Sequence, residues 1–319
     1  MSREERKLRK HFEEKAKREL RLAKKHSQRR STASKSSPAG QITEIGPGYC
    51  DVLAGSQRIR CRPTPDVAIG DNVLFSLDRR RVEEILPRRT VLSRTDPHNP
   101  RIERVIAANV DVVVMVVSLK NPPLRPGLID RYLIAIGKSG AGPLLCVNKI
   151  DLMSADEELD ALRPYQDLRI EVVLCSAATG KGLGMLSAAL AGKTCVFTGH
   201  SGVGKSSLLN ALDQKLDLET NPVSSANERG RHTTTSSAMY ELSNGARVID
   251  TPGIREFGLW DISRAEIARY FDEFNFHRCN FSDCTHTHEP GCAVKVAVES
   301  GDIPTARYQA YLRIVSSSA

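Results

Sequence analysis

The sequence predicts an α/β fold in which a nucleotide-binding domain lies between a small N-terminal β-barrel and a helical C-terminal domain with a cysteine cluster. Strand-like and helix-like stretches alternate between residues 91 and 260, as they do in a parallel sheet covered by helices. A loop with the phosphate-binding pattern G-x-x-x-x-G-K-[ST] follows one of these strands at residues 199–206. The 319 residues have room for two or three domains, and we expect limits at 1–40, 41–90, 91–260 and 261–319.

A basic arm begins the chain. Residues 1–37 carry 14 Lys/Arg and 5 Asp/Glu, a net charge of +9, whereas the whole chain has a net charge of +8. The arm has few apolar residues with which to pack, so we expect it to be disordered or partly helical and to order on a polyanionic partner. A solvated tail without a partner is the alternative interpretation.

The apolar pattern argues against a membrane protein and against a secreted one. The longest apolar run, residues 110–119, is too short to span a bilayer and contains Asp111. The charged N-terminal stretch lacks the apolar segment of a secretory signal. We therefore expect a cytoplasmic protein without a membrane partner. The sequence does not reveal the oligomeric state, but nothing in it argues strongly against a monomer, which we expect.

Residues 41–90 have the pattern of an OB-like β-barrel. Short strand-like stretches alternate with glycine and proline turns, as in five-stranded barrels of this kind. In the stretch Arg-Ile-Arg-Cys-Arg at 58–62, the period of two places three arginines on one face. Further arginines at 79–81 and 88–89 favour contact with nucleic acid. A β domain used only for support is the alternative.

The central domain is expected to contain a parallel sheet that helices cover on both faces. The nearly continuous apolar run at 110–118 is typical of a strand buried on both sides. The expected strands are 110–118, 143–147, 171–174, 194–198, 240–242 and 246–249, and the expected helices are 128–136, 183–190 and 206–212.

The loop at 199–206 predicts binding of nucleoside phosphates. An apolar strand precedes it and a helix follows it, which is the context that this motif requires. Lys205 is expected to reach the β- and γ-phosphates, and the Ser206 hydroxyl to bind Mg²⁺. The expected nucleotide contacts of this loop are Gly199, His200, Ser201, Gly202, Val203, Gly204, Lys205, Ser206 and Ser207.

A second motif predicts that the base is guanine. Residues 148–151 read Asn-Lys-Ile-Asp and follow a buried strand, where a ligand-reading loop is expected. The Asp151 carboxylate can accept hydrogen bonds from guanine N1–H and its 2-amino group, a donor pair that adenine lacks. The expected base contacts are Asn148, Lys149, Ile150 and Asp151, with a further backbone contact from Ser176 and Ala177.

The stretch Asp-Thr-Pro-Gly at 250–253 is expected to complete the part of the site that binds Mg²⁺ and the γ-phosphate. Asp250 is expected to hold Mg²⁺ through water, and Gly253 to sense the γ-phosphate. Within residues 230–235 either Thr233 or Thr234 is the candidate switch threonine, and we select Thr234 as a catalytic residue beside Lys205 and Asp250.

The attacking water lacks its usual partner. Many GTPases place a glutamine after the last of these motifs, and this chain has Ile254, which cannot hydrogen bond to water. His232, beside the candidate switch threonine, is the best candidate to orient the water. A surface histidine without this role is the alternative. The other possibility is that hydrolysis is slow and that a partner stimulates it.

The order of the motifs is rotated. In ordinary GTPases the guanine motif follows the phosphate loop, whereas here it precedes it. All parts are present, so the order predicts a circularly permuted GTPase domain. The chain passes into its C-terminal domain within about ten residues of Gly253, so the nucleotide state could move that domain.

Cysteines and a histidine cluster near the C-terminus. Three thiolates and one imidazole form a closed tetrahedral set, which is typical of structural rather than catalytic zinc. His288 is a spare ligand and His277 a weaker one. The predicted ligands of one Zn²⁺ ion are Cys279, Cys284, His286 and Cys292. The other cysteines lie mostly in apolar strand-like runs and are expected to be buried thiols: Cys50, Cys61, Cys146, Cys175 and Cys195.

These motifs together resemble those of the RsgA (YjeQ) family of bacterial ribosome-associated GTPases. The resemblance covers about residues 40–319 and includes the guanine motif, the phosphate loop, the Asp-Thr-Pro-Gly stretch and the zinc cluster. It implies a cytoplasmic enzyme that binds the small (30S) ribosomal subunit and its rRNA, is stimulated by the subunit and assists its late maturation. His232 falls in the Arg-His-Thr-Thr stretch that contains the family's proposed catalytic histidine. For the arm, charge alone predicts contact with rRNA.

The leading hypothesis is therefore a hydrolase that converts GTP to GDP and phosphate, with Mg²⁺ bound alongside the GTP. A GTP-controlled RNA-binding module, in which hydrolysis only resets binding, is the alternative, and Ile254 keeps it open. An RNA-modifying enzyme with an accessory GTPase would need a second catalytic constellation, which the sequence does not contain.

Overall fold

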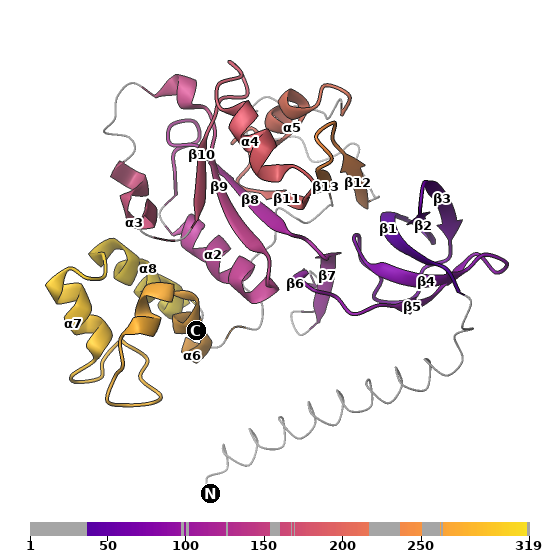
Figure 1. The fold of residues 1–319 in the computed structure, drawn as a ribbon. Helices are drawn as coiled ribbons and strands as arrows, with labels where there is room; N and C mark the ends of the chain where they lie inside the picture. Colours follow the sequence, from indigo (N-terminus) through magenta and orange to yellow (C-terminus); the bar gives the residue numbers. More distant parts are fainter. Residues whose placement is uncertain are drawn as a thin grey trace, which may run out of the picture.

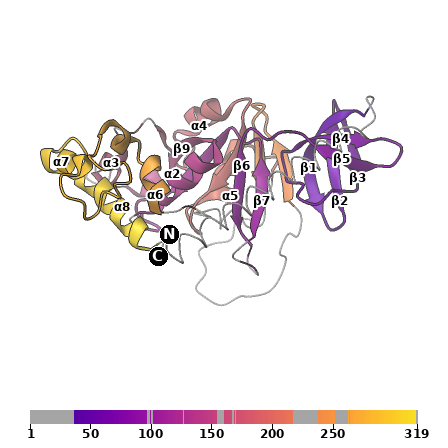
Figure 2. The same ribbon diagram turned by 90° about the horizontal axis from the view of Figure 1, so that it is seen from below.

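The computed structural model describes residues 37–96, 99, 102–125, 127–153, 160–166, 168, 170–216, 237–250, 262 and 264–317. An α/β domain forms the centre, with a β-barrel at one end and a helical domain at the other (Figure 1). Figure 2 shows the three parts in a row. Within the described residues, no helix has both the length and the hydropathy that a membrane crossing requires.

The N-terminal part is a closed five-stranded barrel, as predicted. Strands β1, β2 and β3 pair in succession, and β1 pairs on its other side with β4, which pairs with β5. The barrel closes where the Arg62 amide donates to the Arg80 carbonyl at 2.7 Å and the Val82 amide donates to the Arg62 carbonyl at 3.0 Å. The strands are β1 (Ala39–Gly46), β2 (Tyr49–Ala54), β3 (Gln57–Cys61), β4 (Asn72–Ser76) and β5 (Arg81–Ile85).

The arginines of the barrel divide into two groups. The period of two in β3 is confirmed, because Arg58 and Arg60 are exposed and Cys61 is buried. Arg60, however, donates to Asp51 at 2.9 Å. Arg88 donates from two nitrogens to the fully buried Asp71, at 2.7 and 2.8 Å. Arg88 thus supports the fold, which the sequence did not reveal.

The central sheet has the strand order β10-β9-β8-β11-β13-β12, and only β12 is antiparallel to its neighbour. The observed bounds of β10, β11 and α4 equal the predicted ones, and α2 extends three residues beyond its prediction. The elements are β8 (Val112–Val117), β9 (Gly142–Val147), β10 (Glu171–Leu174), β11 (Thr194–Thr198), β12 (Ser237–Glu241), β13 (Arg247–Asp250), α2 (Leu128–Ser139), α3 (Arg163–Gln166), α4 (Leu183–Leu190) and α5 (Lys205–Leu212).

The apolar run of β8 feeds two separate cores. Val113 and Met115 belong to the cluster under α2 and α3, whereas Val114 and Val116 belong to the cluster under α4 and α5. Because successive side chains of a strand point to opposite faces, both faces of the sheet are covered, as a continuous apolar run predicts. The sequence did not predict a separate hairpin of β6 (Val91–Thr95) and β7 (Glu103–Ala108) beside this domain.

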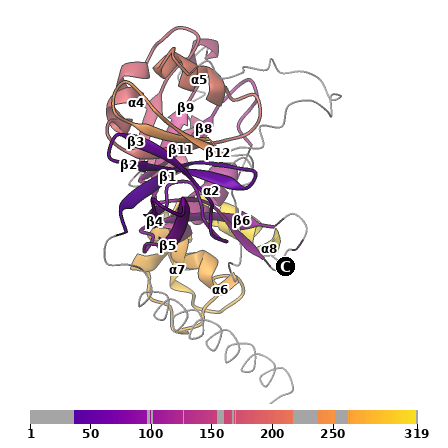
Figure 3. The same ribbon diagram turned by 90° about the vertical axis from the view of Figure 1, so that its right-hand side faces the viewer.

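One hydrogen-bonded ladder runs from the central sheet into the barrel (Figure 3). Glu44 and Ile45 of β1 pair with Ala238 and Ser237 of β12. The side chain of Asn109 also donates to the Gly70 carbonyl at 2.9 Å. The barrel is therefore joined to the central domain through backbone as well as through side chains.

The C-terminal domain packs on α2. Its core contains Phe271, Phe274 and Tyr311, and Ile134 of α2 is buried among them. Residues 264–270 form a short α-helix followed by a 3-10 turn. The elements are α6 (Arg264–Ile267), η4 (Ala268–Tyr270), η5 (Asp272–Phe276), α7 (Ala293–Ser300) and α8 (Thr305–Ser317).

Candidate functional site

The predicted nucleotide motifs meet at one edge of the central sheet. Carboxyl ends of parallel strands lie side by side, and ligands of open α/β sheets bind there. Ser176 follows β10, Asn148 follows β9, Gly199 follows β11, and Asp250 ends β13. Motifs separated by up to 102 residues in the chain thus become neighbours, and only β8 lies between β9 and β11.

The phosphate loop has the backbone that its glycines permit. Gly202 and Gly204 have φ angles of 82° and 93°, in the left-handed region that favours glycine. Helix α5 begins at Lys205, so its free backbone N–H groups face the loop, where anions bind. The Lys205 Nζ donates to the carbonyls of Gly199 at 2.7 Å and His200 at 3.0 Å, which places its positive charge at the loop.

Replacing Gly204 with alanine should weaken binding of both GDP and GTP. A Cβ at this position would lie 2.4 Å from Asn148 Nδ2, and a strained residue costs about 1–3 kcal/mol, so we expect an affinity loss of about tenfold or more. Titration with a fluorescent guanine nucleotide measures the effect. Gly192→Ala is the matched control, because Gly192 also has a positive φ (69°) but a Cβ there meets nothing within 4 Å. Wild-type affinity of the Gly204 variant would contradict the prediction.

Asn148 holds three loops together. Its side chain is buried; its Nδ2 donates to the Val203 carbonyl at 2.8 Å, and its Oδ1 accepts from the Ala177 amide at 3.1 Å. The guanine motif, the phosphate loop and the loop after β10 are therefore fixed relative to one another. This role was not predicted, since the sequence places Asn148 only against the base.

Asp151 is exposed, and a hydroxyl orients it. Ser176, which is fully buried, donates from Oγ to Asp151 Oδ1 at 2.5 Å. Lys149 has a left-handed φ of 66° and donates from Nζ to the Asn121 carbonyl at 2.7 Å. One carboxylate oxygen is thus held while the side chain faces solvent, where the donor pair of guanine can reach it. The sequence predicted only a backbone contact for Ser176. No sequence pattern indicates the hydrogen bond from Ser176 to Asp151 or the one from Lys149 to Asn121.

Of the remaining predicted residues, Asp250 lies within the described part of the chain and the others do not. Asp250 is exposed at the end of β13, beside β11, which leads into the phosphate loop. His232, Thr233, Thr234 and Gly253 lie outside the described residues, as do Thr235 and Ile254.

Four side chains of the C-terminal domain converge as a metal site. The ligand atoms of Cys279, Cys284, His286 and Cys292 all lie within 4.8 Å of one another. Cys279 Sγ lies 3.7 Å from Cys292 Sγ, and His286 Nδ1 lies 3.5 and 3.4 Å from these two sulfurs. A tetrahedral zinc ion with Zn–S bonds of about 2.3 Å needs sulfur–sulfur edges of roughly 3.8 Å. The donor set and its spacing therefore fit Zn²⁺.

The loop that carries His286 is fixed from outside. Tyr308 donates its hydroxyl to the His286 carbonyl at 2.7 Å, and Tyr311 donates to the Thr285 carbonyl at 2.5 Å. Burial opposes ionisation of Glu289, but hydrogen bonds from Thr285 and Thr287 outweigh it and hold the pKa of Glu289 below its usual range. Burial also lowers the pKa of His286, which favours the neutral imidazole that binds metal.

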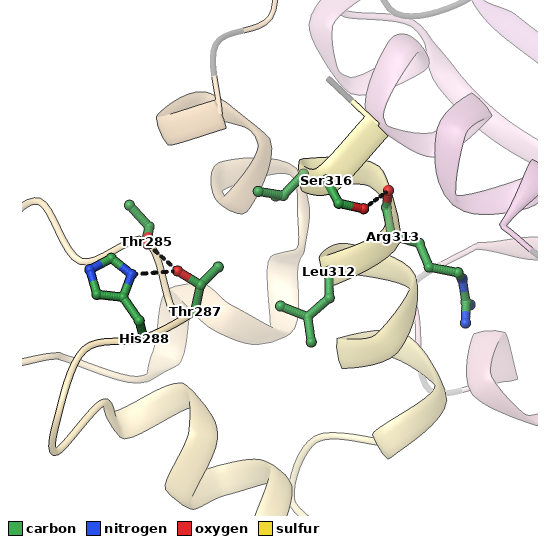
Figure 4. A pocket seen from close by; sticks show the side chains of 7 residues that line it. Thr285, Thr287, His288, Leu312, Arg313 and Ser316 are labelled. Atoms are coloured by element: carbon green, nitrogen blue, oxygen red, sulfur yellow. Dashed lines mark hydrogen bonds between the residues drawn. The ribbon is translucent and has the colours of Figure 1, made fainter. Parts of the chain in front are cut away.

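His288 does not belong to this cluster. Its side chain is 84% exposed, and its Nδ1 lies 3.0 Å from the Thr287 hydroxyl. Figure 4 shows it at a pocket of about 750 Å³ that Leu312, Arg313 and Ser316 of α8 also line. The structure thus leaves both predicted spare ligands, His288 and His277, outside the four converging side chains.

The chain is similar to known GTPases along most of its length. Residues 85–260 match the family model of the RsgA GTPase. The small ribosomal subunit biogenesis GTPase RsgA of Chlorobaculum parvum is 39% identical over 303 residues, which cover 88% of this chain and 97% of that protein. The protein of the same name from Haemophilus influenzae (strain 86-028NP) is 38% identical over 268 residues, 80% of this chain and 77% of that protein.

Solved structures of similar proteins cover most of this chain as well. The crystal structure of YjeQ from Thermotoga maritima has a TM-score of 0.73 and 31% identity, and the match covers 88% of this chain and 98% of that one. YloQ, a circularly permuted GTPase, has a TM-score of 0.68 and 28% identity over 89% of this chain and 96% of its own. The rotated motif order, the strand-edge site and these likenesses together show that the chain belongs to the RsgA family and is a GTP hydrolase.

Proposed function

We propose that this chain hydrolyses GTP to GDP and phosphate on the small ribosomal subunit, late in the subunit's maturation. The observation that supports the proposal is the meeting of the guanine motif and the phosphate loop at one sheet edge, in a chain that is 39% identical to a relative named for small ribosomal subunit biogenesis and aligns with 97% of that relative's length. The chain would act in the cytoplasm, as a monomer, with the subunit and its rRNA as partners.

Each residue of the site has a proposed task. Asp151 selects guanine, Asn148 keeps the three loops in register, and Lys205 binds the β- and γ-phosphates. Ser206 in the first turn of α5 and Asp250 on the neighbouring β13 offer the hard oxygen ligands that Mg²⁺ prefers. Bound Mg²⁺ would neutralise charge that develops on the phosphates.

The remaining roles are proposed from the sequence alone. Thr234 would act as the switch threonine beside Mg²⁺ and the γ-phosphate, and Gly253 would contact that phosphate. His232 would orient the attacking water, because Ile254 cannot. A site without the usual glutamine is expected to turn over slowly until a partner completes it.

Exposed arginines at the barrel closure support an rRNA contact. Arg62 and Arg81 face each other where β3 meets β5, and Arg79 and Arg80 form the adjoining turn. All four are exposed, and arginines bind phosphate oxygens well. The barrel, the basic arm and the zinc-binding domain would together bind the subunit.

GTP turnover measured with purified ribosomal subunits tests the proposal. We expect strong stimulation by small subunits and none by large subunits, and no hydrolysis of ATP in either condition. Equal, slow GTP turnover in every condition would remove the ribosome from the mechanism. It would leave a GTP-controlled binder of some other RNA.

A further inference from the structure

A buried ion network joins the C-terminal domain to α2. Arg307 of α8 donates from Nη1 to Asp130 in the first turn of α2, and from Nε and Nη2 to the two carboxylate oxygens of Glu273, at 2.6 and 3.3 Å. Tyr165 of α3 donates its hydroxyl to the other Asp130 oxygen at 2.9 Å. The side chains of Arg307 and Asp130 are 2% and 1% exposed.

Asp130 depends on Arg307 for its charge balance. A buried carboxylate is costly unless a counter-ion and hydrogen bonds compensate it, and the Tyr165 hydroxyl supplies a hydrogen bond but no charge. The flat guanidinium serves two carboxylates at once and lies 4.5 Å from the centre of the Phe271 ring. The central domain thus contains a buried negative charge that a residue of the C-terminal domain neutralises.

One hydrophobic cluster connects the guanine loop with the helices that meet at Asp130. Ile150 of the guanine motif packs against the cluster that contains Ile129 of α2 and Tyr165 of α3. Lys149 holds the Asn121 carbonyl, in the segment that leads from β8 into α2. The loop that carries the base-selecting carboxylate therefore shares a hydrophobic cluster with α2 and α3, and Lys149 ties it to the chain before α2.

We propose that Arg307 is a positioning residue for guanine-nucleotide binding: by neutralising Asp130 it fixes α2 and α3, and through the hydrophobic cluster that they share with Ile150 it positions the loop that carries Asp151. The C-terminal domain thereby contributes to nucleotide affinity from outside the nucleotide site. The proposal rests on the binding of guanine nucleotides by the central domain and not on the ribosomal role.

Affinity for free GDP and GTP, measured on the full chain without ribosomes, tests this role. Arg307→Met should raise both dissociation constants by about tenfold, within the usual range of coupling between sites, while one zinc ion per chain is retained. Combining it with Asp130→Asn should bring them back to within about threefold of wild type, because the fully buried charge is then removed and the amide oxygen still accepts from Tyr165. The carboxylate of Glu273, which also loses Arg307, is 14% exposed and can be hydrated. Arg307→Lys should fall between wild type and Arg307→Met.

Arg313→Met is the matched control, because it removes an exposed arginine from the same helix that acts on Tyr165 only through its charge. Exposed charges interact weakly, so it should change affinity by less than about threefold. Wild-type nucleotide affinity in a folded Arg307→Met chain would overturn the proposal. So would failure of the double variant to regain affinity, with or without loss of zinc, since the effect of Arg307→Met would then not come from the unpaired charge of Asp130. Ribosomal stimulation enters neither measurement, so this proposal and the proposed function can fail separately.

Discussion

Replacing Lys205 with alanine should lower the rate of GTP hydrolysis by roughly 10²–10³-fold, the usual effect of removing one preorganised group that stabilises transition-state charge. The Lys205 ammonium lies at the phosphate loop, 2.7 Å from the Gly199 carbonyl, where the β- and γ-phosphates bind. It is only half-buried and belongs to none of the hydrophobic cores, so its loss should not unfold α5. Single-turnover hydrolysis with saturating GTP and Mg²⁺ measures the effect.

Lys215→Ala is the matched control for this variant. Lys215 is exposed and follows the same helix by three residues, so its replacement removes the same charge at a distance from the phosphate loop. A Lys205→Ala rate within about threefold of the control would show that the phosphate loop does not catalyse hydrolysis as assigned. The variant also separates the two candidate functions. If it binds small subunits but is not released from them, hydrolysis times release; release at the wild-type rate would favour a binding module controlled by GTP occupancy.

Removing a metal ligand should have the largest effect on stability. Cys292→Ser should abolish zinc binding and unfold the C-terminal domain, because a structural zinc site contributes apparent binding free energies of about 10–16 kcal/mol. Cys292 is buried, belongs to the core of this domain and directly precedes α7. The measurements are zinc content per chain and limited proteolysis, which should cleave within residues 264–317 and spare the central sheet.

His288→Ala is the control, because His288 is the adjacent exposed histidine outside the cluster. It should retain one zinc ion and a protected domain. A Cys292→Ser chain with full zinc content and unchanged proteolysis would refute the ligand assignment, and loss of zinc in the His288 variant would show that the ligand set is different.

Local patterns predicted most of the fold and the motifs. The apolar run at 110–118 became the buried strand β8, and the spacing of the cysteine and histidine residues was enough to select four side chains that converge. Periodicity and spacing report on neighbours in the chain, so they reveal strands, helices and compact motifs.

Partners that are distant in sequence were not predictable in this way. Arg307 and Asp130 are 177 positions apart, and each looks like an ordinary surface charge on an amphipathic helix. The role of the Ser176 hydroxyl was not predictable either, since only the approach of the ends of two strands shows that it orients Asp151. The difference between Arg60 or Arg88, which pair within the barrel, and the exposed arginines at its closure likewise depends on the three-dimensional position of Asp51 and Asp71.

The pairing of β1 with β12 also protects an edge of the central sheet. β12 is the last strand of the central sheet on that side, and an open strand edge offers unpaired amides and carbonyls to other chains. Glu44 and Ile45 of the barrel cover the beginning of that edge. The barrel therefore shields part of the GTPase sheet from edge-to-edge association as well as carrying a candidate RNA surface, and the two domains share one hydrogen-bonded sheet.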